Sequence, residues 1–279
     1  MFNFQTCGVR KRKYVWVLLI AAFLAVGLSG CKSLYRGVQN KSEECQYILD
    51  YLNCDYELLS SETRPEKIIS RFHELTKLGK TDGFYPLIVI PSTTLTDILY
   101  FHMEDIDVEN AADGIAAYRK SVIDSANEIN AKEFLSARYF KLDDILGEFV
   151  QAKPRNALSL QMLTFNSSGE VIIAKIPTEN PWELAVWVPM GGFNECPTPA
   201  EQVAVFHYWY DKYGAVPAVV NYDTWQMTLA KPSFTADEAM ELAEEQFAFC
   251  YDIVLQGTET IRGLASILKN SSVWFFWWD

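Results

Sequence analysis

The last seven residues, Val-Trp-Phe-Phe-Trp-Trp-Asp at 273–279, place large apolar side chains on both faces of any strand that they form. A strand of this kind needs cover on both faces, so we expect it in the interior of a sheet that is packed with helices. The alternative is an aromatic recognition surface, which would leave an apolar patch exposed until a partner covered it. The terminus therefore predicts a domain with a large, layered core.

Helices are predicted along most of the chain from apolar residues at helical spacing, N-terminal capping boxes and glycine stops. The run Thr63-Arg64-Pro65-Glu66 is one capping box, and similar boxes begin at Thr198 and Thr235. The predicted helices cover residues 43–52, the stretch from the first box to Gly79 and Gly83, 95–101, two segments within 109–149 that are broken near Asn130, 200–213, 236–254 and 261–268.

Strands are predicted where short apolar runs lie between turn residues. They cover residues 85–90, 158–165 and 171–176 as a hairpin, 184–188, 218–220 and 225–230. Locally paired strands together with grouped helices are typical of an α+β fold, in this case a mixed, largely antiparallel sheet packed with helices. The sequence predicts one such domain over residues 43–279.

The first thirty residues are ordered like an export signal. Four basic residues at 10–13 precede an apolar run over 14–28, which is about 15 residues long, whereas a membrane-spanning helix needs roughly 20. The run ends in Leu28-Ser29-Gly30-Cys31, which resembles the bacterial lipobox, whose cysteine receives diacylglycerol and becomes the new N-terminus after cleavage. We therefore expect a signal peptide over 1–30 and a lipidated tether over 31–42; a short uncleaved anchor is the alternative.

Lipid on Cys31 would hold the domain at the extracytoplasmic face of a membrane. Lys32 stands where an Asp would resemble an inner-membrane retention signal, which favours the outer membrane in a host that has one. Without residues 1–30 the chain has 20 basic and 36 acidic residues, a net charge of −16 that repels nucleic acid and anionic headgroups. The expected partners are a membrane, held through the lipid, and a protein, but no nucleic acid.

Four further cysteines follow Cys31, in a compartment that permits disulfides. A bond between Cys45 and Cys54 would close the shortest loop, and a bond between Cys196 and Cys250 would join a loop to a helix; free buried thiols are the third alternative. As a group, two of these cysteines and one histidine lack the close ligand spacing of a structural zinc site, so we expect no metal. That group is Cys196, His207 and Cys250.

The most unusual loop has two glycines, Gly191 and Gly192, followed by Asn194, Glu195 and Cys196 just before a predicted helix. Glycines adopt backbone conformations that other residues avoid, and N–H groups at a helix N-terminus attract negative charge. The loop is therefore a candidate binding loop for an anion or a carboxylate. In the alternative, Asn194 and Glu195 bond the local backbone of a tight turn.

Two polar side chains fall on the apolar faces of predicted helices. A helical wheel places Gln246 at the centre of an apolar stripe, and it places His207 beside Val203 and Phe206. A buried amide needs hydrogen-bond partners, so Gln246 either bonds the backbone of a neighbouring loop or faces a ligand pocket. An inward histidine is more often part of the core than a ligand-binding group.

The C-terminal half contains a set of distinctive motifs. They are Pro181-Trp182-Glu183, Gly191-Gly192-Phe193-Asn194-Glu195-Cys196-Pro197, Trp209 with Tyr213-Gly214-Ala215, Leu242-Ala243 with Glu245-Gln246-Phe247, Phe249-Cys250-Tyr251-Asp252, and Trp274 with Phe276-Trp277-Trp278-Asp279. Together they resemble the bacterial family catalogued as domain of unknown function 4253, closely over 176–279 and more loosely from residue 83. The family has no established substrate, so the resemblance implies no catalytic residue. It implies that the anchor is an addition, because many members lack a lipobox.

The signatures of nucleotide-binding loops, zinc proteases and serine-hydrolase elbows are missing from the sequence. Our first hypothesis is a non-enzymatic binding or interaction module at the cell envelope, for example an immunity-like protein that neutralises a toxin. The alternative is a hydrolase-type enzyme with a pocket beside the loop 191–196. Neither hypothesis involves a cofactor. The candidate pocket residues are Trp182, His207, Gln246, Cys250 and Asp279.

Overall fold

The computed structural model describes residues 41–279 except 105–110, 141–142, 161–167, 192, 231 and 233. Residues 1–40, and with them the predicted signal and Cys31, lie outside the described residues. Within the described ranges, no helix has the length and apolar character needed to cross a membrane.

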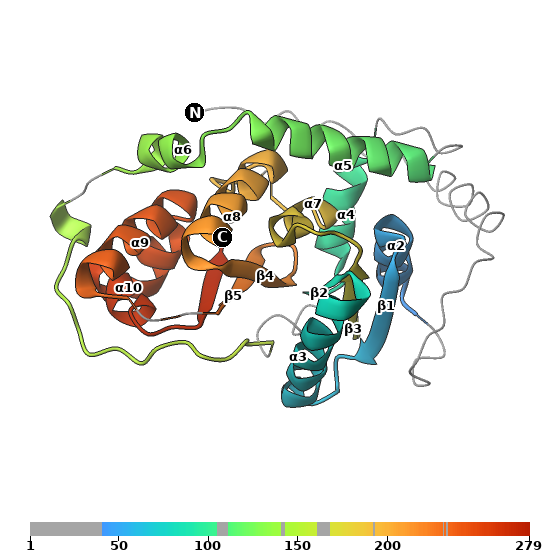
Figure 1. Ribbon diagram of the computed structural model, residues 1–279, viewed down its shortest axis with the longest axis horizontal. Coiled ribbons are helices and arrows are strands. Elements are labelled where there is room, and N and C mark those ends of the chain that lie inside the picture. Colours follow the sequence, from blue (N-terminus) through green and yellow to red (C-terminus); the bar gives the residue numbers. More distant parts are fainter. Residues whose placement is uncertain are drawn as a thin grey trace, which may run out of the picture.

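A six-stranded mixed sheet forms the centre of the fold (Figure 1). Its strand order is β1-β3-β2-β4-β5-β6, and among these pairings only β2 and β4 run parallel. The strands are β1 (Asp55–Ser60), β2 (Tyr85–Val89), β3 (Glu170–Ile176), β4 (Ala215–Val220), β5 (Thr224–Leu229) and β6 (Val273–Trp277). The predicted α+β fold with a largely antiparallel sheet is confirmed.

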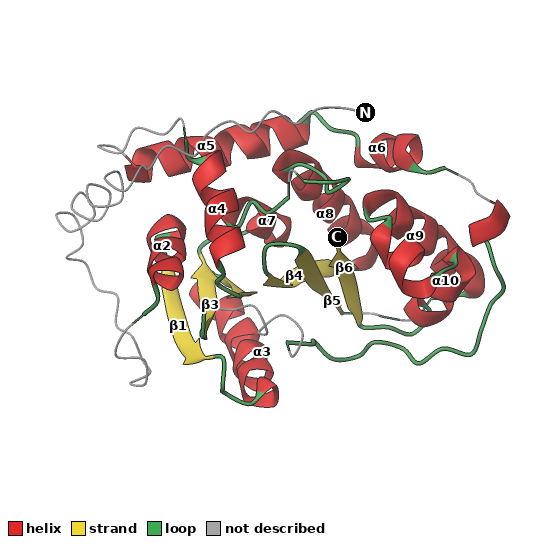
Figure 2. Cartoon of the chain, turned by 180° about the vertical axis from the view of Figure 1, so that it is seen from behind, coloured by secondary structure: helices red, strands yellow, loops and turns green. Residues whose placement is uncertain are grey.

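Helices cover the two faces of this sheet unequally. They are α2 (Glu43–Leu52), α3 (Pro65–Asp82), α4 (Thr93–His102), α5 (Ala111–Asn127), α6 (Ala131–Arg138), α7 (Leu184–Trp187), α8 (Pro199–Tyr213), α9 (Ala236–Phe249) and α10 (Ile261–Leu268). One face packs against α3 through Ile68, Phe72 and Leu75, whereas the other helices contribute to a larger core on the opposite face. Figure 2 shows α3 below β4, with α4, α5, α7 and α8 above it.

Most predicted helices form, with some different ends. The helices α2 and α10 have the predicted boundaries, and the break near Asn130 separates α5 from α6. Capping boxes at Thr198 and Thr235 begin α8 and α9, but α9 ends at Phe249 instead of residue 254. The predicted box at Thr63 is wrong, because α3 begins at Pro65 after Arg64 and has no side-chain cap.

The predicted strand over 184–188 is wrong, because these residues begin with the short helix α7. Leu184, Ala185 and Val186 are all fully buried in this helix. A short apolar run has the same burial in a core helix and in a core strand, so its periodicity does not distinguish them.

The predicted hairpin of 158–165 with 171–176 is also wrong. The second segment is β3, which pairs with β1 on one side and β2 on the other, so no edge of it is open. Residues 158–160 have no regular structure, and residues 161–167 lie outside the described residues. The backbone of Ser159 instead exchanges two hydrogen bonds with the side chain of Gln226, at 2.8 and 2.6 Å.

The aromatic terminus forms β6 at the edge of the sheet, not in its interior. Its Trp274 and Phe276 are fully buried in the main core. On the other face, the guanidinium of Arg155 lies 5.5 Å from the ring of Phe275, and the Arg155 carbonyl accepts a hydrogen bond from Val273 N–H. The expected position in the sheet interior is therefore wrong, and Arg155 contacts the terminal strand at Val273 and Phe275.

Candidate functional site

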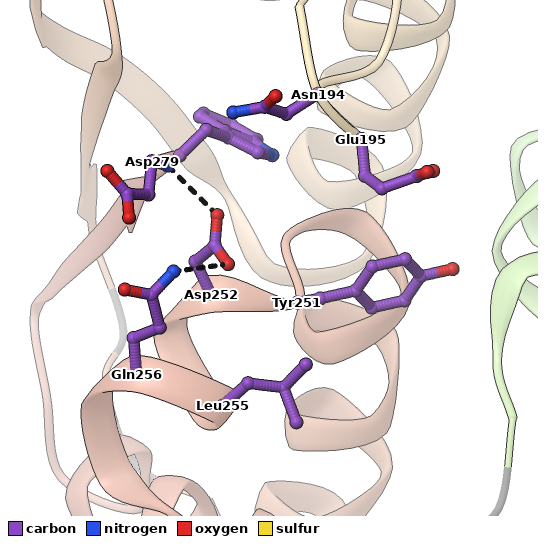
Figure 3. A pocket seen from close by; sticks show the side chains of 8 residues that line it. Asn194, Glu195, Tyr251, Asp252, Leu255, Gln256 and Asp279 are labelled. Atoms are coloured by element: carbon purple, nitrogen blue, oxygen red, sulfur yellow. Dashed lines mark hydrogen bonds between the residues drawn. The ribbon is translucent and has the colours of Figure 1, made fainter. Parts of the chain in front are cut away.

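A pocket of about 250 Å³ lies where the loop before α8, the turn after α9 and the C-terminal residues meet (Figure 3). Figure 3 shows Asn194 and Glu195 on one side of it and Asp252, Leu255 and Gln256 on the other. The lining residues are Asn194, Glu195, Tyr251, Asp252, Leu255, Gln256, Trp278 and Asp279.

The loop wall of the pocket is held by Gln202 of α8, which is fully buried. Its Nε2 donates hydrogen bonds to the carbonyls of Met190, at 2.9 Å, and Pro197, at 2.7 Å. Its Oε1 accepts a hydrogen bond from Trp225 Nε1 at 2.9 Å. Gln202 thus joins both ends of the loop to Trp225 of β5.

Close packing against Gln202 explains the first glycine of the loop. Gly191 has a φ of +108°, and a Cβ at this position would lie 2.8 Å from Gln202 Nε2 and 2.9 Å from Cys196 Sγ. Both the backbone conformation and the contact therefore require a residue without a side chain.

The opposite wall is fixed by hydrogen bonds around Asp252. One carboxylate oxygen of Asp252 accepts from the backbone N–H of Asp279 at 3.0 Å, and the other accepts from Gln256 Nε2 at 3.1 Å. Beneath them, Cys250 Sγ donates to the carbonyl of Trp277 at 2.9 Å. These bonds join the C-terminal residues to the turn that follows α9.

The pocket combines negative charge with apolar surface. Glu195, Asp252 and Asp279 supply three carboxylates, and Leu255 is 47% exposed beside them. One cation is close: the guanidinium of Arg138 donates to the Glu195 carbonyl at 2.6 Å and lies 3.9 Å from its carboxylate. The carboxylates therefore outnumber the neighbouring guanidinium.

The indole N–H of Trp278 is a buried donor of a residue that lines the pocket. Trp278 is 1% exposed and lines the pocket, and its Nε1 has no hydrogen-bond partner among the residues that the structure describes. An unpaired buried N–H costs free energy, so a ligand that brings an acceptor would gain from it.

Residues 172–279 match the family model described as domain of unknown function (DUF4253). The C-terminal part of the chain is a DUF4253 domain. Every lining residue of the pocket belongs to this domain, whereas β1 and β2, the two neighbours of its first strand, precede it. No curated protein and no solved structure matches the chain.

Only some of the predicted site residues of the DUF4253 domain meet at the pocket. Asn194, Glu195 and Asp279 line it, while Gly191 and Cys196 are buried behind the loop. Gly192 lies outside the described residues. The candidate binding loop thus contributes Asn194 and the carboxylate of Glu195 to the pocket wall.

His207 is not on the inner face of its helix, which corrects the helical-wheel assignment. Its side chain is 45% exposed, lies 3.6 Å from Asp211 and stacks on Trp182 with ring centroids 4.0 Å apart. The inner face is formed instead by Gln202, Phe206 and Trp209. Neither His207 nor Trp182 lines the pocket.

Gln246 is buried as predicted, at 1% exposure. Its Nε2 finds no hydrogen-bond partner in the described part of the chain, and the residue does not line the pocket in Figure 3.

Cys45, Cys196 and Cys250 are free buried thiols, the third of the alternatives that the sequence left open. Burial raises the pKa of Cys45 and of Cys250 to about 12, and it raises the pKa of Cys196 as well. A thiol with a raised pKa is protonated at neutral pH and is a poor nucleophile.

The amide of Gln202, which holds the pocket loop, was not among the residues predicted from the sequence. The signal was present, since Gln202, Phe206 and Trp209 share one face of a helix at spacings of four and three residues. Its partners were not predictable, because they are carbonyls of a loop and an indole of another strand.

Proposed function

We propose that this chain is a lipid-anchored binding protein of the cell envelope. In this proposal the pocket of its DUF4253 domain receives a basic side chain of a partner protein. The observation that supports the proposal is the combination of Glu195, Asp252 and Asp279 with an exposed apolar wall.

A lysine or arginine side chain has the chemistry that this pocket complements. Its aliphatic stem packs on Leu255 and on the ring of Tyr251, and its charged end meets the carboxylates. The two oxygens of Asp252 are already held by hydrogen bonds, so its charge is in place before binding. The free N–H of Trp278 offers a bond to a backbone carbonyl of the same partner segment.

The overall charge favours such a partner. The chain after residue 30 carries a net charge of −16, which attracts basic proteins and speeds their association at low ionic strength. The hydrolase pocket expected from the sequence is not assembled, because three of its candidate residues, His207, Gln246 and Cys250, do not line this pocket. The hydrolase alternative therefore gains no support from this geometry.

The binding test uses two blocked peptides, Ac-Leu-Arg-Leu-NH2 and Ac-Leu-Gln-Leu-NH2, titrated into the chain from residue 32 by calorimetry. We expect the arginine peptide to bind at least about tenfold more tightly, which corresponds to about 1.4 kcal/mol. Asp279→Asn removes one carboxylate but keeps the backbone bond to Asp252, and we expect about threefold weaker binding.

The matched control for Asp279→Asn is Glu179→Gln, which changes the same charge at an exposed position away from the pocket. It should leave the affinity unchanged. Equal affinity for the two peptides, or equal loss in both variants, would contradict the proposed site.

The proposed anchor rests on the lipobox-like residues before Cys31 and on the short apolar run. We expect Cys31→Ala to abolish incorporation of labelled palmitate and to release the domain from the membrane fraction. We also expect the anchored protein on the extracytoplasmic face, in the outer membrane where the host has one. A Cys31→Ala protein that stays membrane-bound would overturn the anchor without affecting the pocket.

A further inference from the structure

A second hollow, of about 360 Å³, lies between α5 and the segment that runs from β3 into α7. Its wall includes Ala116, Arg119 and Ile123 of α5, with Val186 and Trp187 of α7 opposite. The hollow is thus built from both parts of the chain, since α5 precedes the DUF4253 domain and α7 belongs to it. We call it the Arg119 hollow.

The guanidinium of Arg119 is held firmly in this wall. It lies 3.7 Å from the ring centroid of Trp187 and 5.2 Å from that of Tyr51. One terminal nitrogen, Nη2, donates to the carbonyls of Tyr51, at 2.8 Å, and Leu52, at 3.4 Å, at the end of α2. These contacts place the charge before any ligand arrives.

The same guanidinium has an unused donor and no paired carboxylate among the described residues. Its Nε is buried and has no hydrogen-bond partner, and no carboxylate oxygen of those residues lies within ion-pair distance of it. The one carboxylate in the wall belongs to Glu183, whose oxygens accept hydrogen bonds from Thr178 and Asn180 instead.

The bonds to α2 provide acceptors for Nη2 of Arg119, but Nε has none among the described residues. A buried donor without an acceptor is rare in folded proteins, and a carboxylate is the acceptor that matches the planar edge of a guanidinium. The apolar side chains of Ile123, Val186 and Trp187 line the same hollow as Arg119. They offer a surface to a hydrocarbon group attached to the carboxylate.

We propose that the Arg119 hollow binds a small carboxylate with an apolar tail. The carboxylate accepts from Nε of Arg119, and the tail packs on Val186 and Trp187. This site is opposite in charge to the pocket in Figure 3 and does not depend on the function proposed for that pocket.

The test compares hexanoate, hexanamide and acetate as probes for the chain from Cys31 onward, by saturation-transfer NMR and calorimetry. We expect hexanoate to bind and both other probes to bind at least tenfold more weakly, because the amide lacks the charge and acetate lacks the tail. Failure of hexanoate to bind at about 10 mM, tenfold above a weak Kd of about 1 mM, or equal binding of hexanoate and hexanamide, would overturn the proposal.

Two tryptophan substitutions locate the site. Ala116→Trp fills the hollow from an exposed helix position without altering Arg119, and it should reduce hexanoate binding at least tenfold. Ala117→Trp, one residue further along the same helix, is exposed but does not line the hollow and should leave binding unchanged. Equal affinity of the two variants would contradict the site. The pair avoids Arg119→Met, which also removes bonds to α2 and is a test only if that variant folds.

Discussion

At the scale of single residues, two buried glutamines have opposite environments. Gln202 donates to two carbonyls of the pocket loop and accepts from Trp225 Nε1, whereas Nε2 of Gln246 has no partner within the described ranges. Both side chains are almost completely buried. A comparison of the two therefore shows how much hydrogen bonding, apart from burial, contributes to stability.

We expect Gln202→Leu to lower the free energy of unfolding by about 3 kcal/mol, because it leaves two carbonyls and an indole N–H unpaired in the core. Gln246→Leu should change it by less than about 1 kcal/mol or raise it, because it removes an unpaired amide nitrogen. Urea unfolding of both variants measures the difference. Equal losses would contradict the assigned hydrogen bonds.

A buried carboxylate on β1 gives a second prediction at this scale. Glu57 is 2% exposed and accepts two hydrogen bonds of 2.7 Å from Arg71, while Lys175 lies 3.3 Å away. Burial by itself raises the pKa of Glu57, but the hydrogen bonds and charges of Arg71 and Lys175 outweigh it, so the pKa is lowered overall.

A lowered pKa in the folded state means that the unfolded state binds the proton more readily. The stability due to Glu57 is therefore fully present above its unfolded pKa of about 4.3 and is lost as the pH falls through the lower folded value. We expect the stability difference between wild type and Glu57→Gln to be largest at neutral pH and to shrink below pH 4. Glu62→Gln, at an exposed position nearby, is the control and should show no such change.

Predictions of single-residue burial were most accurate on helices that have one clear apolar face. The burial of Gln246 followed from its stripe, but His207 was placed on the wrong face, because aromatic residues surround α8 and the wheel has no unique apolar side. Pocket residues such as Asp252 and Trp278 come together only through the fold, so no local pattern indicated them.

At the scale of elements, the three predicted capping boxes show which local signals are reliable. Thr198 directly precedes Pro199 and caps α8, and Thr235 caps α9. Thr63 lies two residues before Pro65, and a proline disfavours helical backbone in the residue before it, so Arg64 becomes the N-terminal flanking residue. Thr63 is therefore too early to cap α3.

This difference predicts the effect of alanine at each threonine. Thr235→Ala should lower the free energy of unfolding by about 1 kcal/mol, because it removes the hydrogen bond to Glu238 N–H. Thr63→Ala should have an effect below about 0.5 kcal/mol, since no cap is lost. Thermal or urea unfolding of the pair checks both values, and a comparable loss at Thr63 would contradict the assigned start of α3.

Strands were harder to predict than helices. Edge strand β1 was not predicted, because a glutamate such as Glu57 is typical of an exposed position although it is buried here. The helix α7 was predicted as a strand, because its apolar run is too short to distinguish helical from strand periodicity. The partners of β3 are two strands from much earlier in the chain. Local patterns therefore predicted where β3 lies in the sequence but not which strands it pairs with.

At the scale of the whole molecule, the DUF4253 domain shares its sheet with the preceding residues. Its first strand, β3, is separated from β4 by β2, which lies outside the family match. A fragment of residues 172–279 therefore lacks the strand that connects β3 to the rest of its own sheet.

We expect the fragment 172–279 to show no cooperative unfolding transition in urea, whereas residues 43–279 unfold in a single transition. The cause is the loss of both neighbours of β3 and of the helices that pack on them. Circular dichroism of the two proteins at equal concentration makes the comparison. A cooperative transition in the fragment would show that the family part folds without β1 and β2.

The most direct measurement of the proposed binding pocket is the indole N–H resonance of Trp278, assigned by its loss in Trp278→Phe. Titration with Ac-Leu-Arg-Leu-NH2 should shift this signal downfield in a saturable way, because an unpaired N–H gains an acceptor, and Asp279→Asn should require more peptide for the same shift. A peptide that leaves the Trp278 signal unmoved at saturating concentration would contradict the pocket as the binding site.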